Sequence, residues 1–375
     1  MIRAFAFYFP QFYAIAENNE WWGSGFTDWD LVRKAKPIGG GQIQPRVPLD
    51  GYHDQSDPAV IVSQARLLKQ YGLSGFNFYH YWFDGRVLLD APVNNLLSNG
   101  AIDIEYVLTW ANESWTRQWV GRPNDYLIKQ MYSSIREEVR NHYNYLRPFF
   151  SDSRYLKVNR SPVFCVYRPE LIPNFVLMQD QMSEFARKDG FTGIHFLACR
   201  SYDVSNAEAL YSSFDGIINF NPRYALNSVL RTTSSYRLFL EKVLRQLPER
   251  AQSMLVGMFR RNASFQSYEY SAFLASLDEQ CKNSSSSLPV YPCVFPDWDN
   301  TARYGEKATF FTGSSPELFA SAVKASCDSL QDHHRKWFFI NAWNEWSEAA
   351  YLEPDEKNGL AYLSALQAVL ATYNR

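Results

Sequence analysis

Short runs of apolar, aromatic and β-branched residues recur along the chain, and each is bounded by polar or turn-forming residues. Runs of this length and composition predict buried β-strands. They lie at residues 2–9, 74–81, 104–110, 162–168, 193–199, 214–220, 290–295 and 337–343. The pattern therefore predicts eight strands.

Segments with the apolar period of an α-helix separate most of these runs. They are residues 58–71, 134–148, 175–189, 236–247, 315–330 and 359–372. The first has Asp57 as a helix N-cap, Pro58 at the first helical position and Gly72 as a stop. Apolar strands that alternate with helices indicate a parallel sheet, and a count of eight indicates a (β/α)8 TIM barrel of the α/β class. We expect residues 1–375 to form this single domain, because the composition shows no break.

The predicted connections are longer at one end of the barrel than at the other. Strand-to-helix loops are long, and they cover residues 10–56, 111–133, 221–235 and 296–314. Long loops at the carboxyl ends of the strands mark the active-site face of a barrel. Two other segments stand apart: residues 149–161 have room for an extra hairpin, and the Ser-rich residues 281–289 are expected to form a mobile surface loop.

Charge and composition narrow the class of ligand. The chain has 37 basic and 39 acidic residues, well mixed, so its charge gives no reason to expect nucleic acid, an anionic membrane or a polyanionic substrate. Aromatic residues make up 17% of the chain, and many stand beside amide and carboxyl side chains. That mixture suits sugar rings, which have apolar faces and hydroxyl edges. The alternative for any one aromatic residue is a place in the core of a large barrel.

Other kinds of site find little support in the sequence. Five cysteines form no C-x-x-C pair and the histidines are scattered, so we expect no disulfide framework, no metal and no cofactor. Nucleotide-binding glycine motifs and a serine nucleophile elbow are also missing from the sequence. The chain opens on a predicted strand, and no run reaches the ~18–20 apolar residues of a membrane span, so we expect a cytoplasmic protein.

The strongest chemical feature is a pair of glutamates, Glu345 and Glu348, directly after the eighth predicted strand. If the chain turns helical there, the two carboxylates project from one side. Their neighbours include the indole of Trp346 and the amides of Asn341 and Asn344, which would desolvate one carboxyl and hydrogen-bond the other. Such an environment separates two carboxyl pKa values into an acid and a base, as glycoside hydrolysis requires. The alternative is an E-x-x-E pair on a solvated helix, which the position at a strand end disfavours.

Further polar and aromatic residues follow other predicted strands and could bind a sugar. Glu113 could supply a third carboxylate, or it could only pair with Arg117 one helical turn later. His80 could donate to a hydroxyl, or it could be a structural residue. Asp297 could bind substrate, or it could belong to a turn that closes its loop. The complete set expected to line the site is Tyr8, Gln11, Trp22, Trp29, Tyr79, His80, Trp82, Trp110, Asn112, Glu113, Trp115, Asp297, Trp298, Asn341, Asn344 and Trp346.

Taken together, these blocks resemble the WbsX-like family, whose barrel is related to glycoside hydrolase family 99, the endo-α-mannosidase and endomannanase group. The similarity runs nearly end to end, through AFYFPQF (6–12), WWGSGFTDW (21–29), AKPIGGGQIQPRVPLD (35–50), GFNFYHYWFDG (75–85), WANESWTRQW (110–119), FPDWDNTAR (295–303) and INAWNEWSEAAYLEPD (340–355). The resemblance implies an oligosaccharide or polysaccharide substrate, such as a bacterial O-antigen-like polymer, and an endo-acting, retaining hydrolase.

By that resemblance Glu348 is the general acid/base that protonates the leaving oxygen. Glu345 takes the proton of the substrate 2-hydroxyl, whose oxygen attacks the anomeric carbon and gives an anhydro-sugar intermediate. A conventional alternative keeps Glu345 as the nucleophile, with Glu113 or Glu348 as the acid. Two positions depart from the family pattern: Ala349 stands where glycine usually follows the second glutamate, and Asp28 replaces a glutamate in the first loop. Both changes are expected to alter the geometry of the loops and, through it, the choice of substrate.

Two other functions remain open at this point. Members of the WbsX group are often described as glycosyltransferases, and DWD at 297–299 fits a D-x-D metal site, although the predicted barrel has no nucleotide-binding fold. The third possibility is a barrel that binds carbohydrate without catalysis. Loss of Glu348 would separate these cases, because a binding protein has no turnover to lose.

Overall fold

The fold is built around a ring of parallel strands. In the computed structural model the described residues are 1–39, 41–117, 121–202, 204, 207–230, 265–282 and 288–374. The strands of the ring are β1 (Arg3–Tyr8), β2 (Gly75–Phe83), β4 (Glu105–Trp110), β8 (Ser161–Val166), β9 (His195–Arg200), β10 (Gly216–Asn219), β12 (Val290–Tyr291), β13 (Cys293–Val294) and β15 (Trp337–Ile340). Hydrogen-bonded neighbours in the ring are all parallel.

The short segments β12 and β13 together fill one strand position. β12 pairs with β10, β13 pairs with β15, and only Pro292 separates the two segments. Proline has no backbone N–H to donate, which interrupts the strand, while the Pro292 carbonyl still accepts a hydrogen bond from Phe339. The ring therefore closes through eight strand positions, which confirms the predicted (β/α)8 barrel. All eight predicted strands coincide with observed ones.

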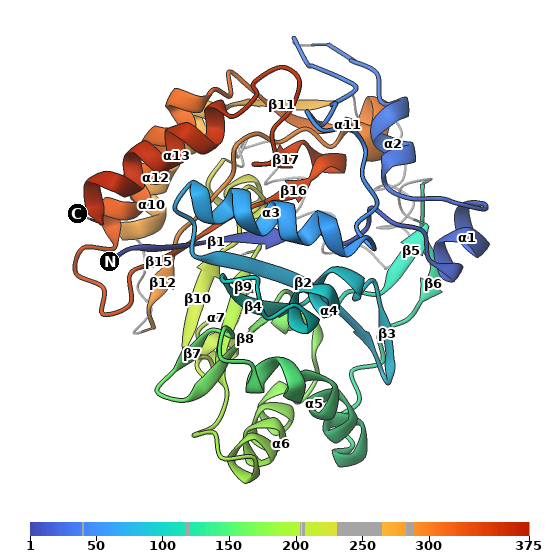
Figure 1. Ribbon diagram of the computed structural model, residues 1–375, viewed down its shortest axis with the longest axis vertical. Coiled ribbons are helices and arrows are strands. Elements are labelled where there is room, and N and C mark those ends of the chain that lie inside the picture. Colours follow the sequence, from blue (N-terminus) through green and yellow to red (C-terminus); the bar gives the residue numbers. More distant parts are fainter. Residues whose placement is uncertain are drawn as a thin grey trace, which may run out of the picture.

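Helices that follow the strands cover the outside of the ring (Figure 1). They are α3 (Pro58–Gln70), α4 (Ala91–Ser98), α5 (Arg136–Ser151), α6 (Phe175–Lys188), α7 (Ala207–Tyr211), α10 (Tyr270–Lys282), α12 (Pro316–Ser329) and α13 (Ala361–Tyr373). Asp57 caps α3 as predicted, since its Oδ1 accepts from the Ala59 amide over 2.8 Å. In the described part of the chain, no helix has the length and apolar composition to cross a membrane.

The helix prediction was less complete than the strand prediction. The segments 58–71, 134–148, 175–189, 315–330 and 359–372 are helical, whereas 236–247 lies outside the described residues. The prediction missed α4, which is too short to show a clear period. It also missed α10.

The long connections gather at the carboxyl ends of the strands. The first loop carries α1 (Ala16–Trp22) and α2 (Trp29–Lys34), and the loop after β4 forms the antiparallel pair β5 (Trp115–Arg117) and β6 (Arg122–Ile128). Figure 1 shows these elements at the end of the barrel opposite to the two chain termini. The hairpin expected within 149–161 is present, because β7 (Lys157–Val158) pairs antiparallel with the start of β8.

Successive residues of a barrel strand point to opposite sides of the ring. Phe7 of β1 contacts Phe220, just beyond β10, across the inside of the barrel, with ring centroids 5.0 Å apart. The next residue, Tyr8, points outward, and its hydroxyl donates to Gln64 of α3 over 2.7 Å. This alternation decides which residues at a strand end can reach the site.

Candidate active site

The loop beyond β15 presents the two glutamates predicted from the sequence. It forms the antiparallel pair β16 (Asn344–Glu345) and β17 (Ala350–Tyr351), joined by a 3₁₀ turn (Trp346–Glu348). Glu345 thus ends a strand and Glu348 ends the turn, so a short hairpin replaces the helix that we considered. Both residues are only 5% exposed.

Buried hydrogen bonds hold this loop from two sides. Asn344 accepts from the backbone N–H of Phe9 over 2.7 Å and donates to the carbonyl of Phe9 over 3.0 Å. The indole N–H of Trp346 donates to Glu353 over 2.6 Å, and Glu353 also accepts from Gln64 over 2.6 Å. These bonds connect the glutamate loop to β1 and α3, and they fix its position.

The backbone conformation of Ala349 shows why glycine is usual at this position in the family. Its φ is 52°, in the left-handed region that glycine adopts without strain. An L-residue pays about 1–2 kcal/mol for this conformation. The backbone turn after Glu348 therefore favours glycine, and the chain keeps the turn with alanine in its place.

One buried arginine connects three carboxylates. Arg303, on α11 (Thr301–Tyr304), donates from Nη1 to Glu348 over 2.8 Å. Its Nη2 donates to Glu345 over 3.1 Å and to Asp28 over 3.0 Å. The Arg303 side chain is 7% exposed, and the Asp28 side chain is fully buried. A single cation therefore partly balances the charges of a carboxylate cluster.

Asp28, the second departure from the family pattern, belongs to this cluster. It precedes α2 in the first loop, and its Oδ2 also accepts from the Ser347 hydroxyl over 2.7 Å. Ser347 lies between the two glutamates in sequence. Asp28 therefore links the first loop to the glutamate loop.

The electrostatic surroundings of the two glutamates differ. Burial raises the pKa of Glu345 well above its ordinary value; Arg303 opposes this rise, and the charges of Glu348 and Asp28 add to it. Glu348 accepts a hydrogen bond from a second guanidinium, that of Arg223, over 3.3 Å. Among the described residues, Glu348 thus contacts two guanidinium groups, whereas Glu345 contacts one.

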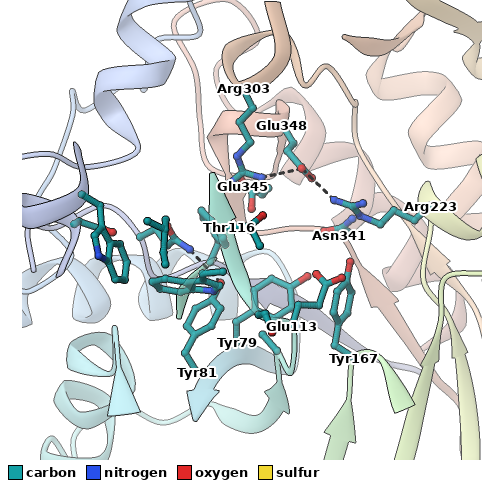
Figure 2. A pocket seen from close by; sticks show the side chains of 18 of the residues that line it. Tyr79, Tyr81, Glu113, Thr116, Tyr167, Arg223, Arg303, Asn341, Glu345 and Glu348 are labelled. Carbon is teal, nitrogen blue, oxygen red and sulfur yellow. Dashed lines mark hydrogen bonds and ion pairs between the residues drawn. The ribbon is translucent and has the colours of Figure 1, made fainter. Parts of the chain in front are cut away.

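These groups lie in the wall of a pocket at the active-site end of the barrel. Figure 2 shows Arg303 and Arg223 approaching Glu348 from two sides, with Tyr79 and Tyr167 on another side of the pocket. The other lining residues are Phe9, Gln11, Asn18, Trp21, Trp22, Tyr81, Ala111, Glu113, Ser114, Trp115, Thr116, Leu127, Phe220, Asn341 and Glu345.

Aromatic side chains from two loops line one part of this pocket. Trp21 of α1 meets Trp115 of β5 edge to face, with ring centroids 5.8 Å apart. Trp22 lies under the guanidinium of Arg117 at 5.2 Å. Nearby, the side-chain nitrogen of Asn18 is buried and has no hydrogen-bond partner within the described residues. Aromatic faces beside an open amide donor can bind a sugar ring and its hydroxyls.

Part of the set predicted to bind sugar lines this pocket. Its members there are Gln11, Trp22, Tyr79, Glu113, Trp115 and Asn341. Glu113 does not pair with Arg117, the alternative considered from sequence; it pairs with Arg168 over 2.6 Å and its side chain is 45% exposed. Arg117 pairs with Asp125 over 3.3 Å.

The remaining predicted residues do not line the pocket. They are Tyr8, Trp29, His80, Trp82, Trp110, Asn112, Asp297, Trp298, Asn344 and Trp346. Several have structural partners instead. Asn112 donates to the carbonyl of Arg168 over 2.7 Å and accepts from its N–H over 2.8 Å, and Asp297 pairs with Arg46 over 2.6 Å. These side chains hold the loops in place around the site.

The segment Tyr79 to Trp82 shows why some predicted residues line the pocket and others do not. Tyr79 and Tyr81 line the pocket, whereas His80 and Trp82 point to the other side of β2, toward α5. The His80 and His142 Nε2 atoms lie 2.9 Å apart, and Trp82 stacks on His142 at 4.6 Å. Burial lowers the pKa of His80 to about 3. Strand alternation therefore places His80 and Trp82 outside the lining of this pocket.

Sequence reasoning missed some pocket residues that the structure brings to the glutamates. Arg303 is the last residue of the block FPDWDNTAR (295–303), and neither Arg223 nor Tyr167 belongs to a quoted motif. Tyr167 directly follows β8, and Arg223 follows β10 closely. The signal was therefore present, since position after a strand end also singled out Glu345.

Comparison with known proteins shows the family of the chain. Residues 4–366 match the model of a family described as Glycosyltransferase WbsX. The chain belongs to the WbsX family. It is 32% identical over 372 residues to the uncharacterized protein WxcX of Xanthomonas campestris pv. campestris (strain B100), a match that covers 97% of this chain and 49% of WxcX. This WbsX chain therefore spans about half the length of the curated relative.

Solved structures share the barrel of this WbsX chain. The GH99 endo-alpha-mannosidase from Bacteroides thetaiotaomicron aligns with a TM-score of 0.59 at 13% identity, over 99% of this chain and 97% of that chain. A glycoside hydrolase-like protein aligns with a TM-score of 0.57 at 13% identity, over 98% and 93% of the two chains. At this identity the similarity concerns the fold.

Proposed function

We propose that this chain breaks glycosidic bonds in an oligosaccharide or polysaccharide, with Glu345 and Glu348 as its catalytic carboxyl groups. The observation that carries the proposal is their common contact with Arg303 in a pocket at the active-site end of the barrel. Glycoside hydrolysis requires two carboxyl groups in one site with separated proton affinities. Aromatic and amide side chains in the same pocket suit a sugar.

The surroundings of the two carboxyl groups support a division of roles. We assign proton donation to Glu345, because burial raises its pKa, and the charges of Glu348 and Asp28 add to this rise against the opposing charge of Arg303. Glu348 is then the partner that acts on the anomeric carbon or through the substrate 2-hydroxyl. This is the reverse of the roles implied by the resemblance to family 99. A substrate with an activated leaving group distinguishes the two, because such a substrate needs little help from the acid.

The proposed substrate is a bacterial surface polysaccharide, cleaved internally with retention of configuration. Its support is the resemblance to family 99 and the aromatic residues Trp21, Trp22 and Trp115, which offer faces for more than one sugar ring. We also propose that the 375 residues act as one domain, because the described helices and strands surround a single barrel.

The test is incubation with a panel of bacterial surface polysaccharides and α-mannans, with new reducing ends read by mass spectrometry. Glu345→Gln and Glu348→Gln should each lower turnover by about 10²-fold or more, as expected for lost acid or base function. Glu306→Gln, an exposed carboxylate close in sequence to Arg303, is the matched control and should retain activity. Near-normal turnover in both catalytic variants would exclude the proposal, and binding without any product would favour a non-catalytic barrel.

Glycosyl transfer is the second candidate, and the family description favours it. The contacts of the D-x-D sequence at 297–299 in the folded chain weaken its support for glycosyl transfer. Both Asp297 oxygens accept hydrogen bonds, from Arg46 and the Trp298 amide, and both Asp299 oxygens accept from Gln44 and the Thr301 amide. These carboxylates already have partners that a metal would need to displace. Turnover of a nucleotide-sugar, together with inert polymers, would favour transfer.

A further inference from the structure

Arg223 places a positive charge in the wall of the pocket, beside the catalytic pair. It follows β10 closely and lines the pocket together with Tyr167 and Glu348. Its side chain is 35% exposed, compared with 7% for Arg303. Figure 2 shows the end of its guanidinium directed toward Glu348 and the interior of the pocket. Arg223 can therefore meet a substrate.

The other arginines near the site are already engaged by carboxylates. Arg303 contacts Asp28, Glu345 and Glu348. Arg168 pairs with Glu113 over 2.6 Å and also with Glu170. Within the described residues, each of these two guanidinium groups therefore pairs with at least two carboxylates.

Arg223 differs from them in how weakly it is engaged. Among the described residues its hydrogen bond is the one to Glu348, at 3.3 Å, and Glu348 already accepts a shorter bond of 2.8 Å from Arg303. A guanidinium has five donors in a planar fork that matches a carboxylate. Arg223 can thus turn donors toward a second anion while Arg303 continues to balance Glu348.

The surroundings of Arg223 strengthen an interaction with an anion. Its guanidinium lies 5.8 Å from the centre of the buried Trp298 ring, and Phe220 and Tyr167 line the same pocket. A substrate bound against these walls would exclude water from Arg223, and a charge-assisted hydrogen bond is stronger where water is excluded. The hydroxyl of a neutral sugar could be bound by amides alone, as offered by Asn18 and Gln11.

We propose that Arg223 binds a carboxylate of the sugar that lies next to Glu348, so that the substrate is an acidic glycan containing a uronic acid. This inference rests on the proposed function of the pocket. The near-neutral charge of the whole chain gave no reason to expect an acidic substrate, but it does not show that a cation lies at the site.

The experiment measures binding and not turnover. Methyl uronosides of the gluco, galacto and manno series are titrated into the full chain beside the neutral methyl glycosides of the same series, and dissociation constants are measured by NMR. At least one uronoside should bind about 10-fold or more tightly than its neutral counterpart. Arg223→Gln should abolish that preference, whereas Arg223→Lys should keep part of it, because lysine retains the charge without the fork.

Arg136→Gln is the matched control, since Arg136 is an exposed arginine of α5 paired with Glu184, outside the pocket lining. It should keep the preference in full. Thermal melting of each variant shows whether it is folded, and Arg223→Lys provides a second test if Arg223→Gln is not. Equal affinity for charged and neutral glycosides would overturn the proposal, as would a preference that persists in Arg223→Gln.

Two further outcomes are distinguishable. Tighter binding of the matching sugar 6-phosphates than of the uronosides would overturn the carboxylate assignment in favour of a phosphorylated sugar. Uronoside binding that depends on Arg223 in a protein that cleaves no polymer would uphold the acidic ligand while the hydrolase proposal fails. Cleavage of neutral polymers without uronoside preference would give the reverse result.

Discussion

Arg303 donates from Nη1 to a carboxylate oxygen of Glu348 over 2.8 Å, although the two residues come from loops after different barrel strands. The same guanidinium also contacts Glu345 and Asp28. Three carboxyl groups thus depend on one buried cation. This arrangement makes the stability of the loops and the proton affinity of the proposed acid depend on the same contacts.

Removal of the cation should destabilise the fold. Arg303→Gln leaves buried carboxylates without their charge partner, which should lower the free energy of unfolding by about 3–5 kcal/mol. Urea unfolding at neutral pH measures the loss. The double variant Asp28→Asn, Arg303→Gln should lose less than the sum of the two single variants, because one uncompensated charge is gone. Additive losses would show that the two side chains do not interact.

Asp28 should tune the pH dependence of activity. Its negative charge helps to raise the pKa of Glu345, so Asp28→Asn should lower that pKa, since removal of a nearby negative charge makes ionisation easier. If Glu345 acts as the acid, activity is lost as pH rises through its pKa. The alkaline limb of kcat/KM should therefore move to lower pH in the variant. A limb that stays in place, or moves to higher pH, would contradict this assignment.

Glu353 should act as a positioning residue behind the glutamate loop. Its carboxylate accepts from Trp346 and Gln64, and a glutamine at this position cannot accept both bonds in the same way. Glu353→Gln should lower kcat about 10-fold with KM changed little, because the loop shifts without loss of a substrate contact. Glu356→Gln, an exposed carboxylate three residues later, is the control. Equal kinetics in the two variants would refute the positioning role.

The His80 and His142 pair should make the fold sensitive to acid. Burial lowers the pKa of His80 to about 3, whereas an unfolded histidine titrates near 6.5, so the unfolded chain binds protons more readily between these values. The unfolding free energy should fall as pH drops from 7 to 5, by about 2 kcal/mol from this group. His80→Gln should reduce that fall, measured by urea unfolding at both pH values. The exposed His334→Gln should behave like the wild type, and an unchanged fall in His80→Gln would contradict the expectation.

Local pattern predicted the strands and the glutamate pair for a definite reason. A strand buried on both sides reads as a short apolar run, and a barrel places catalytic groups directly after such runs. Position after a strand, together with the neighbouring indole and amide side chains, therefore indicated Glu345 and Glu348. The same rule applies to Arg223 and Tyr167, but neither stands in a distinctive motif, and no local pattern indicates that they meet the glutamates.

The sequence by itself determined the barrel, because the alternation of apolar strands and helices allows few other folds, and it determined where the carboxylates stand relative to a strand end. Only the tertiary structure decided which side chains face the pocket. Tyr79 and His80 are neighbours in the chain, yet strand alternation directs one toward the pocket and the other toward α5. Tertiary structure also brought Asp28, Arg303 and Arg223 around the glutamates. Such contacts join loops that are far apart in sequence, and the positions of those loops are set by closure of the ring.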